Sequence, residues 1–257
     1  MFDFGANTGK NIPYYLSKAK MVVAVEANPS LAEELVKQYA GFIKSGQLRI
    51  LNKCITPPAD QHQEVDFYIH RYHSGLSRFP VPEQHIEDYT KIRVSSISYQ
   101  QLIDQFGLPD LVKIDLEGAD HLILQSILES SVIPAYVSVE NWGRPVLEAL
   151  LSHPGFHYYN LVSFYNFSSI YGYSGIDTAG PFGTDIKSPW LNRSAISAVY
   201  NQMPDPWFDI HASSIAFETG QPDLRFYAKR FNLALLLKSL FPHRLKSRIK
   251  DLIGFRR

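Results

Sequence analysis

The first nine residues constrain the fold most strongly, because an apolar strand runs there directly into a glycine-rich turn. Residues 1–4 are apolar except for Asp3, and Gly5, Asn7 and Gly9 follow on alternate positions. Glycine leaves the backbone bare and asparagine tolerates left-handed dihedral angles, so a nucleotide can approach such a turn closely. The spacing D-x-G-x-N-x-G differs from G-x-G-x-x-G, and the chain contains no G-x-x-x-x-G-K-[ST]. Taken alone, this glycine turn (residues 3–9) also fits an ordinary strand-to-helix connection.

An acidic residue at the end of the next apolar run favours a nucleoside ligand. Residues 21–25 predict a second buried strand, and Glu26 follows it directly, before Asn28 and Pro29. In doubly wound sheets, an acid about twenty residues beyond the first glycines binds the ribose hydroxyls. We therefore predict a nucleoside cofactor. An NAD(P)-dependent oxidoreductase is an alternative because Glu26 suits an adenosine ribose, although the missing G-x-G-x-x-G argues against it.

Three further carboxylates follow two later strands. Residues 110–115 predict a strand beside the first, with Asp115 and Glu117 at its carboxyl end, and residues 135–139 predict the strand that delivers Glu140. Open α/β sheets bind ligands at this edge, so we expect the three acids to converge. They fit either a divalent metal site or a general base. A purely structural alternative is that Asp115 accepts hydrogen bonds from the next turn and Glu117 shapes the start of a helix.

The glycine turn, Val25–Pro29 and Val112–Asp120 together resemble the FkbM-type methyltransferases, an S-adenosylmethionine-dependent family. The resemblance runs from Met1 to about Asn141. It implies an α/β, Rossmann-like class I methyltransferase fold, with a doubly wound seven-stranded sheet whose last strand is antiparallel. It also implies O-methylation of a hydroxyl on a sugar, glycan or secondary metabolite.

We expect the cofactor to contact the two turns and the end of a third strand, residues 48–55, which lies near the adenine position in sheets of this class. The predicted cofactor-binding residues are Asp3, Gly5, Ala6, Asn7, Gly9, Glu26, Ala27, Cys54 and Ile55.

Two histidines are further candidates for a base. His73 belongs to residues 70–89, a polar stretch without periodicity that we interpret as a lid or substrate loop. His211 lies two residues after Asp209 in an extended segment, so both side chains would point the same way. The predicted catalytic set is therefore Asp115, Glu117, Glu140 and His211, with His73 in reserve.

The hydrophobic periodicity of the other segments predicts further strands of the sheet and the helices that pack on it. Helices are expected at 11–19, from 29 onward, at 98–106 and at 119–129, and strands at 65–69, 160–165 and 194–201, the last being the final strand.

The 257 residues, 45% of them hydrophobic, predict one methyltransferase domain, 1–224, and a C-terminal tail, 225–257. The tail holds ten Lys or Arg and one acid, so the domain keeps 15 basic and 24 acidic residues of the totals of 25 and 25, a net charge of −9. Such a domain repels polyanions, so we expect no nucleic-acid partner, and we expect the acceptor to be a small-molecule or glycan hydroxyl. Cys54 is the only cysteine, which excludes an internal disulfide.

The tail predicts a basic amphipathic helix after Pro242, with Leu245, Ile249 and Leu252 on one face. Such helices contact anionic membranes, a partner or the parent domain. Because Met1 begins inside the first predicted strand, we expect no signal peptide and a cytoplasmic protein. A tail that contacts an anionic membrane would make this protein membrane-associated. A catalytically silent cofactor-fold module anchored through the tail is a third interpretation.

Overall fold

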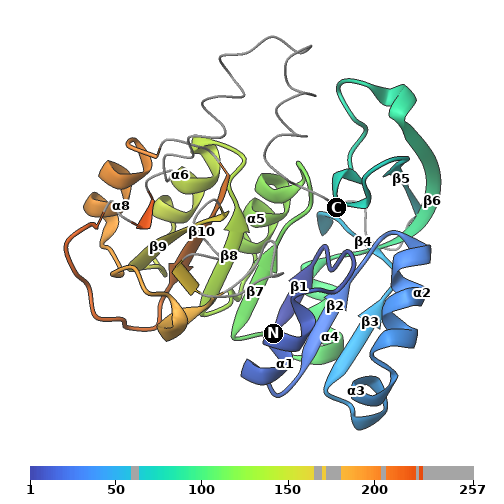
Figure 1. Cartoon of the computed structure of the whole chain (residues 1–257), viewed down its shortest axis with the longest axis horizontal. Helices are drawn as coiled ribbons and strands as arrows, with labels where there is room; N and C mark the ends of the chain where they lie inside the picture. The colour runs from blue at the N-terminus through green and yellow to red at the C-terminus, as the bar shows by residue number, and fades with distance from the viewer. Residues whose placement is uncertain (59–63, 165–169, 172–180, 204–206, 224–225, 228–257) are drawn as a thin grey trace, which may run out of the picture.

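A seven-stranded sheet organises the chain in the computed structural model, which describes residues 1–58, 64–164, 170–171, 181–203, 207–223 and 226–227 (Figure 1). The strand order is β3-β2-β1-β7-β8-β10-β9. The strands are β1 (Phe2–Phe4), β2 (Val22–Val25), β3 (Leu48–Leu51), β7 (Leu111–Ile114), β8 (Tyr136–Glu140), β9 (Tyr158–Ser163) and β10 (Phe208–Ser213). The first five in this spatial order pair in parallel, and β10 runs antiparallel to both β8 and β9. The predicted doubly wound sheet with an antiparallel last strand is confirmed.

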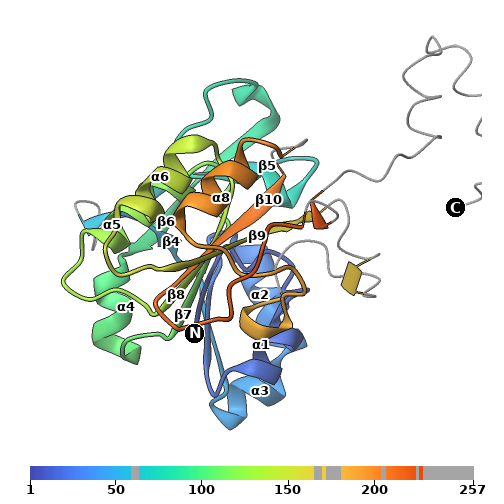
Figure 2. The same ribbon diagram turned by 90° about the vertical axis from the view of Figure 1, so that its left-hand side faces the viewer.

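Helices cover both faces of this sheet, as the edge-on view shows (Figure 2). One face carries α1 (Ile12–Lys18), α2 (Pro29–Gln38) and α3 (Ala40–Ser45). The other carries α4 (Tyr99–Phe106), α5 (Asp120–Leu128), α6 (Arg144–Ser152) and α8 (Arg193–Tyr200). Two hydrophobic clusters fill the space between helices and sheet, one on each face. The central strands are buried on both faces, which is why they read as continuous apolar runs.

Side-chain caps fix where two of the predicted helices begin. The Asn28 Oδ1 accepts from the Ser30 N–H at 3.1 Å, and Pro29 occupies the first turn of α2. Ser98 and Gln101 form a capping box at the start of α4. A cap of this kind stabilises a helix by about 1 kcal/mol. Both starts agree with the prediction from sequence.

A second, three-stranded sheet has the order β4-β6-β5 and comprises β4 (Cys54–Ile55), β5 (Glu64–His70) and β6 (Tyr89–Ile97). The single strand predicted at 48–55 is therefore wrong, because β3 ends at Leu51 and β4 pairs with β6 instead. Asn52 lies at the break, where its Nδ2 donates to the carbonyls of Glu26 and Ala27 at 2.9 and 3.1 Å. The predicted loop 70–89 contains two short 3₁₀ turns, at Ser74–Leu76 and Ile86–Asp88.

The strand predicted at 194–201 is also wrong, because these residues form α8. Asn192 caps the helix through Oδ1, which accepts from the Ala195 N–H at 2.9 Å, and Ile196 and Val199 are buried. Their i, i+3 spacing fits a helix rather than a strand. The final strand is β10, at the extended segment that holds Asp209 and His211.

The predicted tail helix lies outside the described residues, so its structure and any membrane contact stay predictions. Within the described ranges, no helix has the length and apolar character needed to cross a membrane.

Candidate active site

A cavity of about 320 Å³ opens at the carboxyl ends of β1, β2, β7 and β8. Small-molecule sites usually measure about 300–1,000 Å³. Eight of the nine predicted cofactor-binding residues line it: Asp3, Gly5, Ala6, Asn7, Glu26, Ala27, Cys54 and Ile55. Asp115, Glu117 and Glu140 line it as well. The structure therefore brings the two predicted groups together in one cavity.

Gly5 and Gly9 have different tasks in the glycine turn. Gly5 has φ +89°, and a Cβ there would overlap the backbone oxygen of Asp115, so the turn after β1 can pack directly against the turn after β7. Gly9 has φ +71° and packs against the Leu35 side chain of α2. It does not line the cavity. The structure thus places Gly9 in the support of the turn.

Glu26 holds the glycine turn to the start of α2. Its Oε2 accepts from the Asn7 N–H and its Oε1 from the Asn28 N–H, both at 2.7 Å. Only 6% of Glu26 is exposed, and this burial raises its pKa although the backbone donors oppose the shift. Each carboxylate oxygen has a second lone pair, so Glu26 can accept further hydrogen bonds from a ligand in the cavity. Its structural role was not predicted from the sequence.

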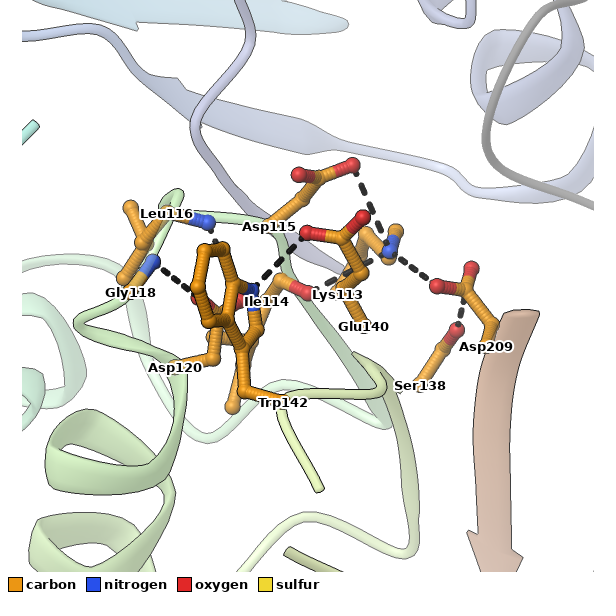
Figure 3. Close-up of polar contacts among 10 residues, drawn as sticks. All are labelled: Lys113, Ile114, Asp115, Leu116, Gly118, Asp120, Ser138, Glu140, Trp142 and Asp209. Atoms are coloured by element: carbon orange, nitrogen blue, oxygen red, sulfur yellow. Dashed lines mark hydrogen bonds and ion pairs between the residues drawn. The ribbon is translucent and has the colours of Figure 1, made fainter. Parts of the chain in front are cut away.

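Asp115, Glu117 and Glu140 form a carboxylate cluster in which one oxygen of each lies within 4.8 Å of the others. Burial, with the Asp115 carboxylate adding to it, raises the pKa of Glu117 to about 8 and that of Glu140 to about 9. Trp142 donates from Nε1 to Glu140 Oε2 at 3.0 Å (Figure 3). Glu117 and Glu140 therefore carry protons at neutral pH.

Lys113 lies beside this cluster, and the sequence patterns do not predict it as a site residue. Its side chain is 1% exposed, and Nζ lies 2.8 Å from Asp209 Oδ1 and 3.6 Å from Asp115 Oδ2 (Figure 3). Burial opposes the charge, but Asp209 and Asp115 raise the pKa of Lys113 above its ordinary value. Asp209 is itself fully buried and also accepts from Ser138 Oγ at 3.3 Å. The sequence feature that could have indicated Lys113 is its position as a charged residue inside the apolar run of β7.

Asp120, and not Asp115, accepts the hydrogen bonds of the turn that follows β7. The two Asp120 carboxylate oxygens accept from the N–H groups of Leu116 and Gly118, each at 3.0 Å. These bonds hold the turn in which Glu117 takes a left-handed φ of +53°. Burial is the main cause that raises the pKa of Asp120 to about 7. Asp120 thus shapes the turn that presents Glu117.

The structure brings neither candidate histidine to the cavity. His211 is 0% exposed, its Nδ1 lies 2.9 Å from the Tyr136 hydroxyl, and burial lowers its pKa to about 3. His73 is exposed, and its backbone N–H donates to His70 Nδ1 at 3.1 Å. Its neighbour Ser74 does line the cavity and donates to Asn7 Oδ1 at 3.0 Å. The geometry therefore favours the carboxylates over the imidazoles as proton acceptors.

The strand order and the antiparallel β10 are those of the class I methyltransferase fold, and the cavity with its acids lies at the carboxyl ends of β2, β7 and β8. The family model described as the methyltransferase FkbM domain matches residues 3–157. The chain belongs to this FkbM methyltransferase family, which confirms the predicted family and argues against the oxidoreductase alternative.

Solved structures with a similar fold share little sequence with this chain. The methyltransferase FkbM from Methylobacillus flagellatus KT is 13% identical, with a TM-score of 0.40 over 82% of this chain and 42% of its own. An rRNA methylase from Streptococcus thermophilus is 9% identical, with a TM-score of 0.38 over 84% and 86% of the two chains. TrmK from M. capricolum, solved with S-adenosylhomocysteine, is 12% identical, with a TM-score of 0.34 over 100% and 80%.

These likenesses are too distant to carry an argument about the acceptor. The chain spans 42% of the length of the first of these structures. Among curated proteins, none matches the chain.

Proposed function

We propose that the cavity binds S-adenosylmethionine and that the enzyme transfers its methyl group to a hydroxyl of a sugar, glycan or secondary metabolite. The observation that carries this proposal is that one cavity is lined both by the glycine turn with Glu26 and by the carboxylate cluster. Methyl transfer needs a donor and a proton acceptor within one site. Membership of the FkbM family supports the same reaction class.

The cofactor lies, in this proposal, along the edge formed by β1 and β2. The glycine turn approaches the part of the cofactor that carries the methyl group, and Glu26 accepts hydrogen bonds from the ribose hydroxyls. Cys54, Ile55 and Phe67, which are buried and line the cavity, contact the adenine in this proposal. The carboxylate cluster then faces the methyl group from the β7 and β8 side.

The chemistry asks the protein for orientation and for one proton transfer. The acceptor oxygen attacks the methyl carbon in line with the carbon–sulfur bond, the bond electrons return to sulfur as a thioether, and the hydroxyl proton leaves to a carboxylate. We assign the base to Asp115, because it lies 3.6 Å from the Lys113 ammonium and within 4.8 Å of an oxygen of each glutamate. Glu117 and Glu140, with pKa values near 8 and 9, carry protons at neutral pH and can donate hydrogen bonds to the acceptor.

A divalent metal is the second candidate for activating the hydroxyl. Three carboxylate oxygens within 4.8 Å of one another match the oxygen ligands that Mg²⁺ and Mn²⁺ prefer. The Lys113 ammonium, 3.6 Å from Asp115 Oδ2, works against a cation at this point. We therefore favour the base.

Incubation with methyl-labelled S-adenosylmethionine and a panel of sugars, glycans and hydroxylated metabolites tests the reaction directly. We expect label in an O-methyl group, found by mass spectrometry, and the same rate with and without a chelator. Labelling of RNA instead would contradict the small-molecule acceptor. Activity that is lost with chelator and restored by Mn²⁺ would replace the base with a metal.

A further inference from the structure

The guanidinium of Arg78 lies near the carboxylate cluster and has no role in the function proposed above. It comes from the segment between β5 and β6, where its backbone pairs with Tyr68. In the part of the chain that the structure describes, no hydrogen bond or ion pair involves its side chain, and its Nε is buried without an acceptor. Leaving a buried charged donor unpaired costs free energy, so such a group needs an explanation.

The guanidinium of Arg78 lies beside the cavity, behind two residues that adjoin its lining. A Cβ on Gly118 would overlap the guanidinium, so Arg78 packs directly on the turn that presents Glu117. Its Cζ lies 5.7 Å from the centre of the Trp142 ring, and Trp142 donates to Glu140. Figure 3 shows Trp142 lying between Gly118 and Glu140. Arg78 thus touches two residues that border the carboxylate cluster.

Arginine on an aromatic ring is suited to binding a planar oxyanion. The ring holds the guanidinium plane, and the N–H fork matches the oxygens of a carboxylate or phosphate. Among the described residues, Glu117 makes no ion pair with Arg78, and burial raises the pKa of Glu117 to about 8 although the Arg78 charge opposes this shift. The guanidinium is therefore available to a ligand.

We propose that the acceptor carries a carboxylate or phosphate group, which Arg78 binds, and that its adjoining ring or chain packs on Trp142. This inference rests on the proposed function, because it extends the same acceptor site. The Trp142 side chain connects Arg78 with the carboxylate cluster, because its ring packs against the Arg78 guanidinium and its N–H donates to Glu140. An acceptor anchored at Arg78 would thus bring its hydroxyl to the carboxylate cluster.

Two side-chain N–H groups make the test independent of turnover. In ¹⁵N-labelled full-length protein saturated with S-adenosylhomocysteine, the Nε–H resonance of Arg78 is identified with Arg78→Lys and the indole N–H of Trp142 with Trp142→Phe. Inorganic phosphate and acetate are then titrated separately, with sodium chloride at equal ionic strength as the control. We expect a saturable shift of both resonances in the millimolar range. The tighter-binding anion tells whether the acceptor's group is a phosphate or a carboxylate.

Arg78→Gln should weaken the anion's effect on the Trp142 resonance by about tenfold or more, since a charged partner is lost. Arg71→Gln is the matched control, because Arg71 is exposed on the same segment and its Nε faces Thr90 Oγ1 at 3.4 Å; it should change nothing. Resonances that respond to phosphate and acetate no more than to chloride would overturn the inference and leave Arg78 as a screen for Glu117. If the cofactor product fails to bind but Arg78 still binds phosphate, the proposed function fails and the anion subsite stands.

Discussion

Lys113 and Asp209 form a buried ion pair across the sheet, with 2.8 Å between Nζ and Oδ1 and at most 1% of either side chain exposed. Lys113 belongs to β7 and Asp209 to β10, and β8 with Ser138 lies between them. The pair therefore joins the antiparallel end of the sheet to the strand that carries Asp115.

Lys113→Met should lower the free energy of unfolding by about 3–5 kcal/mol, because it leaves Asp209 buried without its partner. Lys113→Met combined with Asp209→Asn should recover part of this loss, since both charges are gone. Urea denaturation measures both. Lys91→Met, which breaks an exposed ion pair with Asp66, is the control and should have little effect. A double variant less stable than the sum of the single variants would contradict the pairing argument.

The parts of the site that could be predicted from sequence follow from short-range spacing. The glycine turn, Glu26 and the three cluster acids each sit at the end of an apolar run, and the rule that ligands bind at the carboxyl ends of strands places them together. Lys113 could not be predicted, because its partner Asp209 lies 96 residues away. The helix α8 was mistaken for a strand because a short apolar run fits both periods.

Arg78 and Gly9 show what local sequence patterns do not predict: Arg78 belongs to no motif, whereas Gly9 belongs to the glycine turn but does not line the cavity. Arg78 pairs through its backbone with Tyr68 and packs on Gly118, and no local sequence pattern reveals either contact. Gly9 belongs to the motif but packs against α2. Tertiary packing decided both positions.

Glu26→Gln should weaken the binding of S-adenosylhomocysteine by about 1–3 kcal/mol, because the ribose hydroxyls lose a charged acceptor. Glutamine keeps an acceptor oxygen for one of the two backbone donors, Asn7 or Asn28, so the turn is disturbed less than by alanine, which keeps none. Calorimetric titration measures the affinity, and circular dichroism checks the fold. Glu33→Gln, an exposed change on α2, is the control. Equal affinity in Glu26→Gln and the parent protein would remove Glu26 from the site.

Asp115→Asn should reduce turnover by about a hundredfold or more while the affinity for S-adenosylhomocysteine barely changes, because shape is preserved and the base is lost. Single-turnover methyl transfer separates the chemical step from binding. Asp110→Asn, directly before the amino end of β7 and outside the cavity lining, serves as the control. A fully active Asp115→Asn enzyme would reject the assignment of the base.

The raised pKa of Glu140 makes a prediction about pH and stability. Its pKa is about 9 in the folded chain and 4.5 ordinarily, so between these values the folded state binds more protons than the unfolded state. Stability due to this group therefore falls as pH rises from about 4.5 to 9. Urea denaturation of the parent and Glu140→Gln across this range should show the variant gaining relative stability toward high pH.

This comparison separates the effect of Glu140 from that of His211. The lowered pKa of His211 acts in the opposite direction, because the stability that His211 contributes is lost as pH falls from 6.5 toward 3. A difference between the parent and Glu140→Gln that stays constant with pH would show that Glu140 does not carry the buried proton.

In the function that we propose, the cavity between the glycine turn and the carboxylate cluster binds S-adenosylmethionine. Calorimetric titration of the full chain with S-adenosylhomocysteine, and then with NAD and NADP, tests it most directly. We predict saturable binding of S-adenosylhomocysteine with one site per chain and no heat of binding from either nicotinamide cofactor. Binding of NAD or NADP without binding of S-adenosylhomocysteine would contradict the account.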